Sequence, residues 1–267
     1  MGKATGILRR LGASKGWWIA VALVLWLIFV VSQIPAVWGA YAMTRSGQLA
    51  LSGVSGTLWS GRASLASFKA DGIDYSLGQL YWKLKPWSLL TLNPCADIVT
   101  ELDRQHIEGE VCAGIGGSLV LRDATISAPA ALLQPTLPLS IDGNLSASIV
   151  LMEVQGDYLQ ELRGNLSWTA AQIHNGNNWM ALGSYAAQLA DDDRGGIVAD
   201  VFQLDGPADI ALQVKLLAGG GGAVSGTFSM NRAFATEIQA DAWLSMFAQT
   251  AGTDEQGNTR YQIDLQF

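Results

Sequence analysis

Two hydrophobic patterns divide the chain, and the first is a long apolar stretch near the amino terminus. Residues 17–31 are all apolar, residues 34–37 extend the stretch, and no charge lies between Lys15 and Arg45. A helix rises about 1.5 Å per residue, so roughly 20 apolar residues suffice to cross the hydrocarbon core of a bilayer. The pattern therefore predicts a single transmembrane helix over residues 17–38.

The charges around this stretch predict its orientation. Residues 1–44 contain four basic residues and no acidic residue. Basic residues are retained on the cytoplasmic side of a membrane span. We therefore expect a basic cytoplasmic tail over residues 1–16 and a translocated domain over residues 39–267. The four basic residues are Lys3, Arg9, Arg10 and Lys15.

A cleaved signal peptide is the alternative interpretation of the same stretch. Ala40-Tyr41-Ala42 has the small-x-small pattern of a cleavage site. The apolar run is long for a signal peptide, however, and this site lies well beyond it. Amino-terminal sequencing distinguishes the two interpretations, because cleavage would leave Met43 as the first residue.

The second pattern begins after residue 45 and is an alternation of apolar and polar residues. It is clear over residues 141–149, 209–216 and 260–267. A period of two is typical of a strand with one buried face. Frequent Gly, Asn and Asp between such segments favour hairpins, so we expect a mainly β fold built on an antiparallel sheet. Only residues 240–250 and a short turn at 86–92 favour helix.

Glycines recur at the centre of a pentad, apolar-x-Gly-x-apolar, and this predicts curvature. With a period of two, each glycine lies on the same face as its apolar neighbours, where a strand is either bulged or closely approached by a neighbour. Repetition of this feature should coil the sheet into a curved wall or groove. The alternative is chance, since the chain contains 30 glycines. The central glycines are Gly56, Gly109, Gly143, Gly164, Gly206 and Gly226.

Composition excludes several classes of protein. Hydrophobic residues make up 49% of the chain and charged residues only 15%, which excludes a disordered polar chain. The formal net charge is −7, and residues 45–267 hold 12 basic against all 23 acidic residues, which gives −11. A basic surface is needed to displace counterions from phosphates, so this charge argues against nucleic acid as a partner.

Candidate catalytic and metal-binding residues are scarce. The two histidines, His106 and His174, are far apart in the sequence and belong to no metal-ligand spacing, and two cysteines are too few for a zinc cluster. We therefore expect no catalytic residue, no cofactor and no metal. The chain is interpreted as a binding or scaffolding protein and not as an enzyme.

Cys95 and Cys112 lie 17 positions apart in the translocated part. In an oxidising, periplasm-like compartment an isolated pair of cysteines usually forms a disulfide. Closing a loop of this size would stabilise the fold by about 3 kcal/mol in the chain-entropy model. Two buried thiols are the alternative, and a free-thiol assay on denatured, unreduced protein separates the two cases.

Several segments resemble a known family. Residues 53–63, GVSGTLWSGRA, follow shortly after QIPA at 33–36 and resemble the opening of type II secretion system protein N. Residues 80–90, LYWKLKPWSLL, resemble the same family, as do GNLSW at 164–168 and LGSY at 182–185. The resemblance covers nearly the whole chain.

The resemblance implies a non-catalytic inner-membrane component of the type II protein secretion system, with a periplasmic β-rich domain. That system exports folded periplasmic proteins across the outer membrane, and the implied partners are its other components, in the inner-membrane platform or the secretin. The family is also related in fold to AsmA-like proteins, whose coiled sheets form grooves. An AsmA-like lipid-binding or lipid-transfer protein in the periplasm is therefore the alternative function.

Three tryptophans in the family-like segments, Trp59, Trp82 and Trp87, are candidate interface residues. Tryptophan is over-represented where proteins contact partners. The competing interpretation is that these rings pack within the sheet or at its edge, where a large ring also buries much apolar surface.

Overall fold

The amino-terminal region forms two helices that meet at a proline. The computed structural model describes residues 15–266 apart from 46, 71, 115, 138–139, 157, 175–177, 193–195, 218–220, 238–247 and 254–256. Helix α1 covers Lys15–Ser32 and helix α2 covers Ala36–Thr44, with Pro35 between them in an extended conformation. Proline has no backbone N–H and disfavours the helical conformation of the preceding residue, so the helix is interrupted there.

This interruption bears on the predicted membrane span. In the part of the chain that the structure describes, no helix combines the length and apolar character needed to cross a membrane. The prediction of one transmembrane helix over residues 17–38 is therefore not supported by the structure.

The rest of the fold is one antiparallel sheet of fifteen strands, as the alternating pattern predicts. Strand order follows chain order, except that β15 lies between β13 and β14 and that β2 pairs with β3. The strands are β1 Leu49–Ser52, β2 Ser55–Gly56, β3 Ser60–Ala70, β4 Ile73–Leu84, β5 Cys95–Leu102, β6 Gln105–Ala113, β7 Ser118–Pro129, β8 Ile141–Gln155, β9 Tyr158–His174, β10 Trp179–Asp191, β11 Ile197–Asp205, β12 Ala208–Leu216, β13 Gly222–Met230, β14 Ala248–Thr253 and β15 Thr259–Gln266.

Among the described residues, three short helical segments interrupt the run of strands. Helix α3 covers Pro86–Leu90 and is the turn expected at 86–92, η1 is a 3-10 helix over Ala130–Thr136, and α4 covers Arg232–Glu237. The helix expected over residues 240–250 falls mostly outside the described residues. Its last three residues belong to strand β14 instead.

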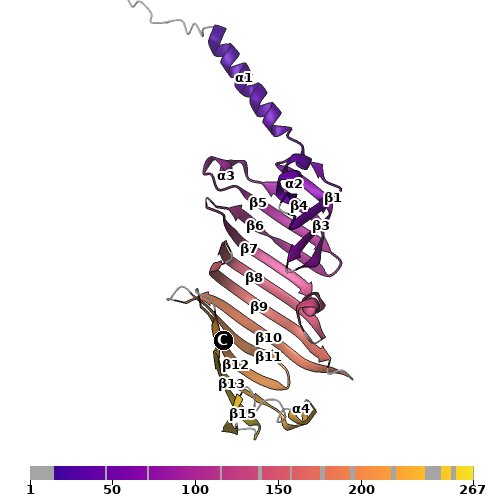
Figure 1. Ribbon diagram of the computed structural model, residues 1–267, viewed down its shortest axis with the longest axis vertical. Helices are drawn as coiled ribbons and strands as arrows, with labels where there is room; N and C mark the ends of the chain where they lie inside the picture. The colour runs from indigo at the N-terminus through magenta and orange to yellow at the C-terminus, as the bar shows by residue number, and fades with distance from the viewer. Residues whose placement is uncertain are drawn as a thin grey trace, which may run out of the picture.

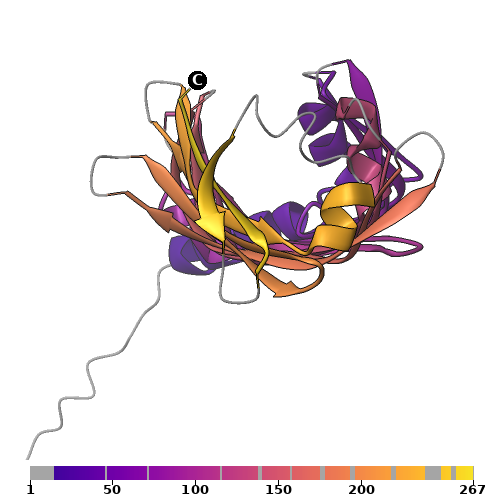
Figure 2. The ribbon, with the colours of Figure 1, turned by 90° about the horizontal axis from the view of Figure 1, so that it is seen from below.

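The sheet is strongly coiled. Figure 1 shows the strands stacked along the long axis of the molecule, and Figure 2, along that axis, shows that they curve into an open trough with α4 on its inner side. Gly143 has a φ of +118° beside a register shift between β8 and β9. A Cβ on Gly164 would lie 2.4 Å from the carbonyl oxygen of Ser148. At these pentads the predicted bulge or close approach is confirmed.

The core is the inner face of the trough and not a layer between two sheets. Small groups of buried residues follow this face, such as Ala63 with Leu80 on β3 and β4, and Phe228 with Phe234 on β13 and α4. Part of the apolar inner face is uncovered, since Phe68 on β3 is 37% exposed and Leu166 on β9 is 40% exposed.

Candidate functional site

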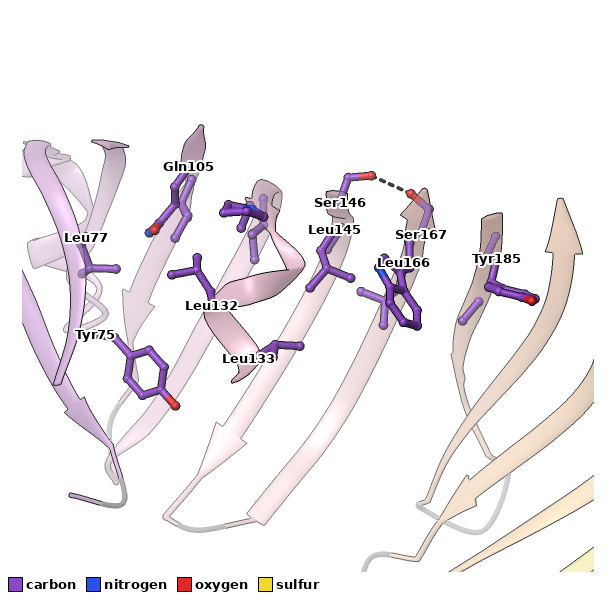
Figure 3. A pocket seen from close by; sticks show the side chains of 18 of the residues that line it. Tyr75, Leu77, Gln105, Leu132, Leu133, Leu145, Ser146, Leu166, Ser167 and Tyr185 are labelled. Carbon is purple, nitrogen blue, oxygen red and sulfur yellow. Dashed lines mark hydrogen bonds between the residues drawn. The ribbon is translucent and has the colours of Figure 1, made fainter. Parts of the chain in front are cut away.

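The inner face contains a large apolar cavity, which we call the apolar trough. Its volume is about 770 Å³, and residues of β3, β4, β6 to β11 and η1 line it (Figure 3). The residues that define it here are Tyr75, Leu77, Ile107, Ile126, Leu132, Leu133, Leu145, Leu166, Trp168, Tyr185 and Val201.

Strand register explains why these side chains share one face. Leu166 on β9 lies opposite Ala147 on β8 and Ala187 on β10, and Ala187 lies opposite Val201 on β11. Side chains at paired positions in a sheet project to the same side. The alanines on either side of Leu166 have small side chains, so they leave space above the sheet that leucines at the same positions would fill.

A bulge keeps the apolar face continuous along β4. Leu77 and Leu80 are three residues apart, so a regular strand would place them on opposite faces. Gly78 lies between them with a φ of +72°, where the pairing of β3 with β4 shifts. Leu77 and Leu80 consequently pack in one cluster with Ala66.

Several polar groups at the trough are paired within the protein, and the Ser146 and Ser167 hydroxyls hydrogen-bond to each other at 2.6 Å. The Tyr185 hydroxyl donates to the Leu182 carbonyl at 2.7 Å, and burial raises the pKa of this phenol above its ordinary value, so it stays neutral. The Trp168 indole donates to the Asp142 carbonyl at 3.1 Å. None of the described lining residues is acidic, basic, histidine or cysteine. The described lining is thus mostly apolar and offers contact to an alkyl chain.

Cys95 and Cys112 form a disulfide. They are opposite each other in the pairing of β5 with β6, with Cα atoms 4.0 Å apart. Glu110 lies near both sulfurs, and a cluster of two cysteines and a carboxylate could in principle hold a metal ion. Because both sulfurs are joined to each other, neither is available as a thiolate ligand.

Trp59 fastens the sheet to the end of helix α1. Its indole N–H donates to the carbonyl of Val31 at 2.8 Å, and the adjacent Leu58 N–H donates to the carbonyl of Ile34 at 2.8 Å. The bend between β2 and β3 that carries Trp59 therefore holds the last turn of α1 and Ile34, two residues beyond the end of this helix.

The other two tryptophans have contrasting environments. Trp82 is half-buried, packs against Ala63 and Leu80, and donates its indole N–H to the Leu58 carbonyl at 3.2 Å. Trp87, on α3, is 80% exposed. Trp59 and Trp82 thus make internal hydrogen bonds, and only Trp87 presents most of its ring to the surroundings. The interface role of all three stays a prediction.

Sequence comparisons place the chain among known proteins. A family model described as type II secretion system (T2SS), protein N matches residues 47–261, which covers the sheet almost entirely. Type II secretion system protein N of Aeromonas hydrophila is 29% identical over 191 residues, 69% of this chain and 73% of that protein. Its counterpart in Vibrio cholerae serotype O1 is 30% identical over 166 residues, 60% of this chain and 64% of that protein. No solved structure matches the chain significantly.

Proposed function

Because the chain belongs to the type II secretion system protein N family, we propose that it is a non-catalytic component of this system, anchored in the inner membrane with its sheet in the periplasm. Membership makes the protein a component of type II secretion. The observation that carries the proposal is the extent of the family match, from residue 47 to 261. The absence of acidic, basic, histidine and cysteine side chains from the described lining of the trough is consistent with a non-catalytic role.

Helix α1 supports the proposed anchor. It extends away from the sheet in Figure 1, and its large apolar side chains are exposed, including Leu25 at 61%, Trp26 at 63% and Phe29 at 64%. Exposing such surface to water costs about 25 cal/mol per Å², so an apolar environment stabilises this helix. The basic residues that precede it favour a cytoplasmic amino terminus, and the disulfide suits an oxidising periplasm.

Deletion of the gene is expected to lower the amount of exported protein in the medium, with retention of the folded cargo in the periplasm. The physical reason is that other secretion components would lose the surface this sheet supplies. The measurement is the ratio of extracellular to periplasmic cargo under secreting conditions, with a plasmid-borne wild-type copy as the control. An unchanged ratio would count against the proposed role.

A second candidate function, binding of an alkyl chain such as that of a lipid, is favoured by the apolar trough. The trough is apolar along the rows from β4 to β11, and it opens to the surroundings. A large uncovered apolar surface is uncommon on a monomeric protein and marks a site of interaction. An alkyl chain in the trough would remove part of that surface from water.

This second function predicts lipid adducts from one face of β8 only. A photo-reactive amino acid in place of Leu145 is expected to crosslink to lipid in cells, because Leu145 lines the trough. The same amino acid in place of Ser148, which is on the other face of β8, is the matched control. Lipid adducts would be detected by mass spectrometry. Equal yields at the two positions, or none at Leu145, would exclude lipid from the trough.

A further inference from the structure

Helix α3 and the two residues after it carry a group of exposed apolar side chains, which we call the α3 tip. It consists of Trp87, Leu90 and Leu92, which are 80%, 76% and 69% exposed. No charged residue occurs between Pro86 and Pro94, although the surrounding domain is acidic. Three large apolar side chains exposed within six residues form an apolar surface of the kind that marks a site of interaction with an apolar partner.

The α3 tip lies close to the point where α1 leaves the sheet. The backbone N–H of Leu84 donates to the carbonyl of Trp59 at 2.8 Å, and the Trp59 indole donates to Val31 at the end of α1. Strand β4 ends at Leu84, two residues before α3 begins. Figure 1 shows α3 at the end of the sheet from which α1 extends.

The base of α3 is held rigidly. The Ser88 hydroxyl donates to the Lys85 carbonyl and accepts the Cys95 N–H at 2.8 Å. The Lys85 ammonium lies 2.8 Å from Asp97 and 3.1 Å from Glu110, and hydrogen bonds to these carboxylates raise its pKa, so it stays charged. The loop is preorganised, which lowers the entropy that its side chains would lose on binding.

The backbone at Leu92 favours a different residue from the one present. Leu92 has a φ of +58°, a region that is unfavourable for bulky residues and is better tolerated by glycine or asparagine. A leucine at this position therefore costs some stability. The side chain contributes no buried packing that would offset the cost, because it is 69% exposed.

We propose that the α3 tip inserts into the interfacial region of the same bilayer that holds α1. Tryptophan and leucine suit this region, since the indole ring is stabilised at the level of the headgroups and the leucines reach the acyl boundary. The inference rests on the proposed membrane anchor. Two attachment points, α1 and the α3 tip, fix the tilt of the trough relative to the membrane, which a single helix does not.

Photo-crosslinking in cells tests the proposal on the full chain. A benzophenone amino acid replaces Leu90 in one variant, Leu25 of α1 in a second, and Leu204, a 55% exposed residue of β11, in a third. We expect lipid adducts at Leu25 and Leu90 and none at Leu204. Lipid at Leu25 with protein or nothing at Leu90 would overturn this inference and leave the anchor intact, whereas absence of lipid at Leu25 would overturn the anchor as well.

The substitution Leu92→Asn separates membrane contact from folding. Asparagine tolerates the positive φ, so the unfolding midpoint should not fall, while the loss of an apolar side chain should lower the lipid adduct yield at position 90. An unchanged yield would show that the α3 tip does not depend on apolar contact and would overturn the proposal.

Discussion

Replacement of Gly164 by valine is expected to destabilise the sheet by about 3 kcal/mol, the upper end of the usual cost of overpacking. A Cβ at this position would lie 2.4 Å from the Ser148 carbonyl oxygen and 2.9 Å from the Ile149 Cα. Both atoms belong to the backbone of β8, which cannot move without disturbing its pairing with β7 and β9. The larger valine side chain would force these central strands apart.

The measurement is urea unfolding followed by tryptophan fluorescence, in which the midpoint should fall while the slope stays the same. Gly156→Asn is the matched control in the same hairpin. Gly156 has a φ of +61°, which asparagine tolerates, and open space lies around its missing Cβ, so little change is expected. A wild-type midpoint for the Gly164 variant would show that β8 and β9 are not packed as described.

The strands and their antiparallel pairing were largely predictable from the sequence, because local alternation indicates the strands and the turn residues between them indicate hairpins. The pattern over residues 209–216 corresponds to β12 and that over residues 260–267 to β15, and each of these strands begins one residue before its pattern. Hairpin connections follow from the turn residues between strands. These features need only neighbouring residues, so one sequence suffices to predict them.

The apolar trough was not predictable in the same way, because strand pairing and bulges determine its lining. Leu77 and Leu80 share a face only because of the bulge at Gly78. In a regular strand, residues three positions apart would lie on opposite faces. The row from Leu166 through Ala187 to Val201 depends on the register of two successive strand pairs. A sequence indicates which residues of one strand share a face, but it does not give the register between neighbouring strands.

The membrane-proximal end shows a similar limit. Apolar character alone predicted a helix over residues 17–38, but the backbone restriction at Pro35 interrupts it. The hydrogen bond from Trp59 to Val31 joins residues 28 positions apart, and no local pattern indicates it. The prediction of tryptophans at an interface also treated Trp59, Trp82 and Trp87 alike, whereas only Trp87 is largely exposed.

The α3 base and the trough are connected through β4, which lines the trough and leads into α3, and β5 pairs with β4 beside them. Strand β4 contributes Leu77 to the trough and leads through Leu84 into α3, and β5 returns from α3 at Cys95. A displacement of α3 would therefore also move β4, and with it the strands that are hydrogen-bonded to β4. Any bilayer contact of α3 would orient the open side of the trough.

Removal of the disulfide, by Cys95→Ala together with Cys112→Ala, is expected to lower stability by about 3 kcal/mol in the chain-entropy model for a 17-residue separation. The bond joins β5 to β6 directly below α3, so its loss should also loosen the α3 base. The backbone N–H of residue 95, which donates to the Ser88 hydroxyl, should exchange with solvent faster. Hydrogen exchange would measure this rate, beside a measurement of the unfolding midpoint.

Reduced wild-type protein is the control for this variant, because reduction breaks the bond and keeps both side chains. We expect its midpoint to fall by nearly as much as that of the double variant, with the remainder due to the two buried sulfur atoms that alanine removes. Equal midpoints for oxidised and reduced wild-type protein would contradict a stabilising role for the bond. A fall in midpoint without faster exchange of the backbone N–H of residue 95 would instead show that Ser88 and the Lys85 ion pairs hold the α3 base without the disulfide.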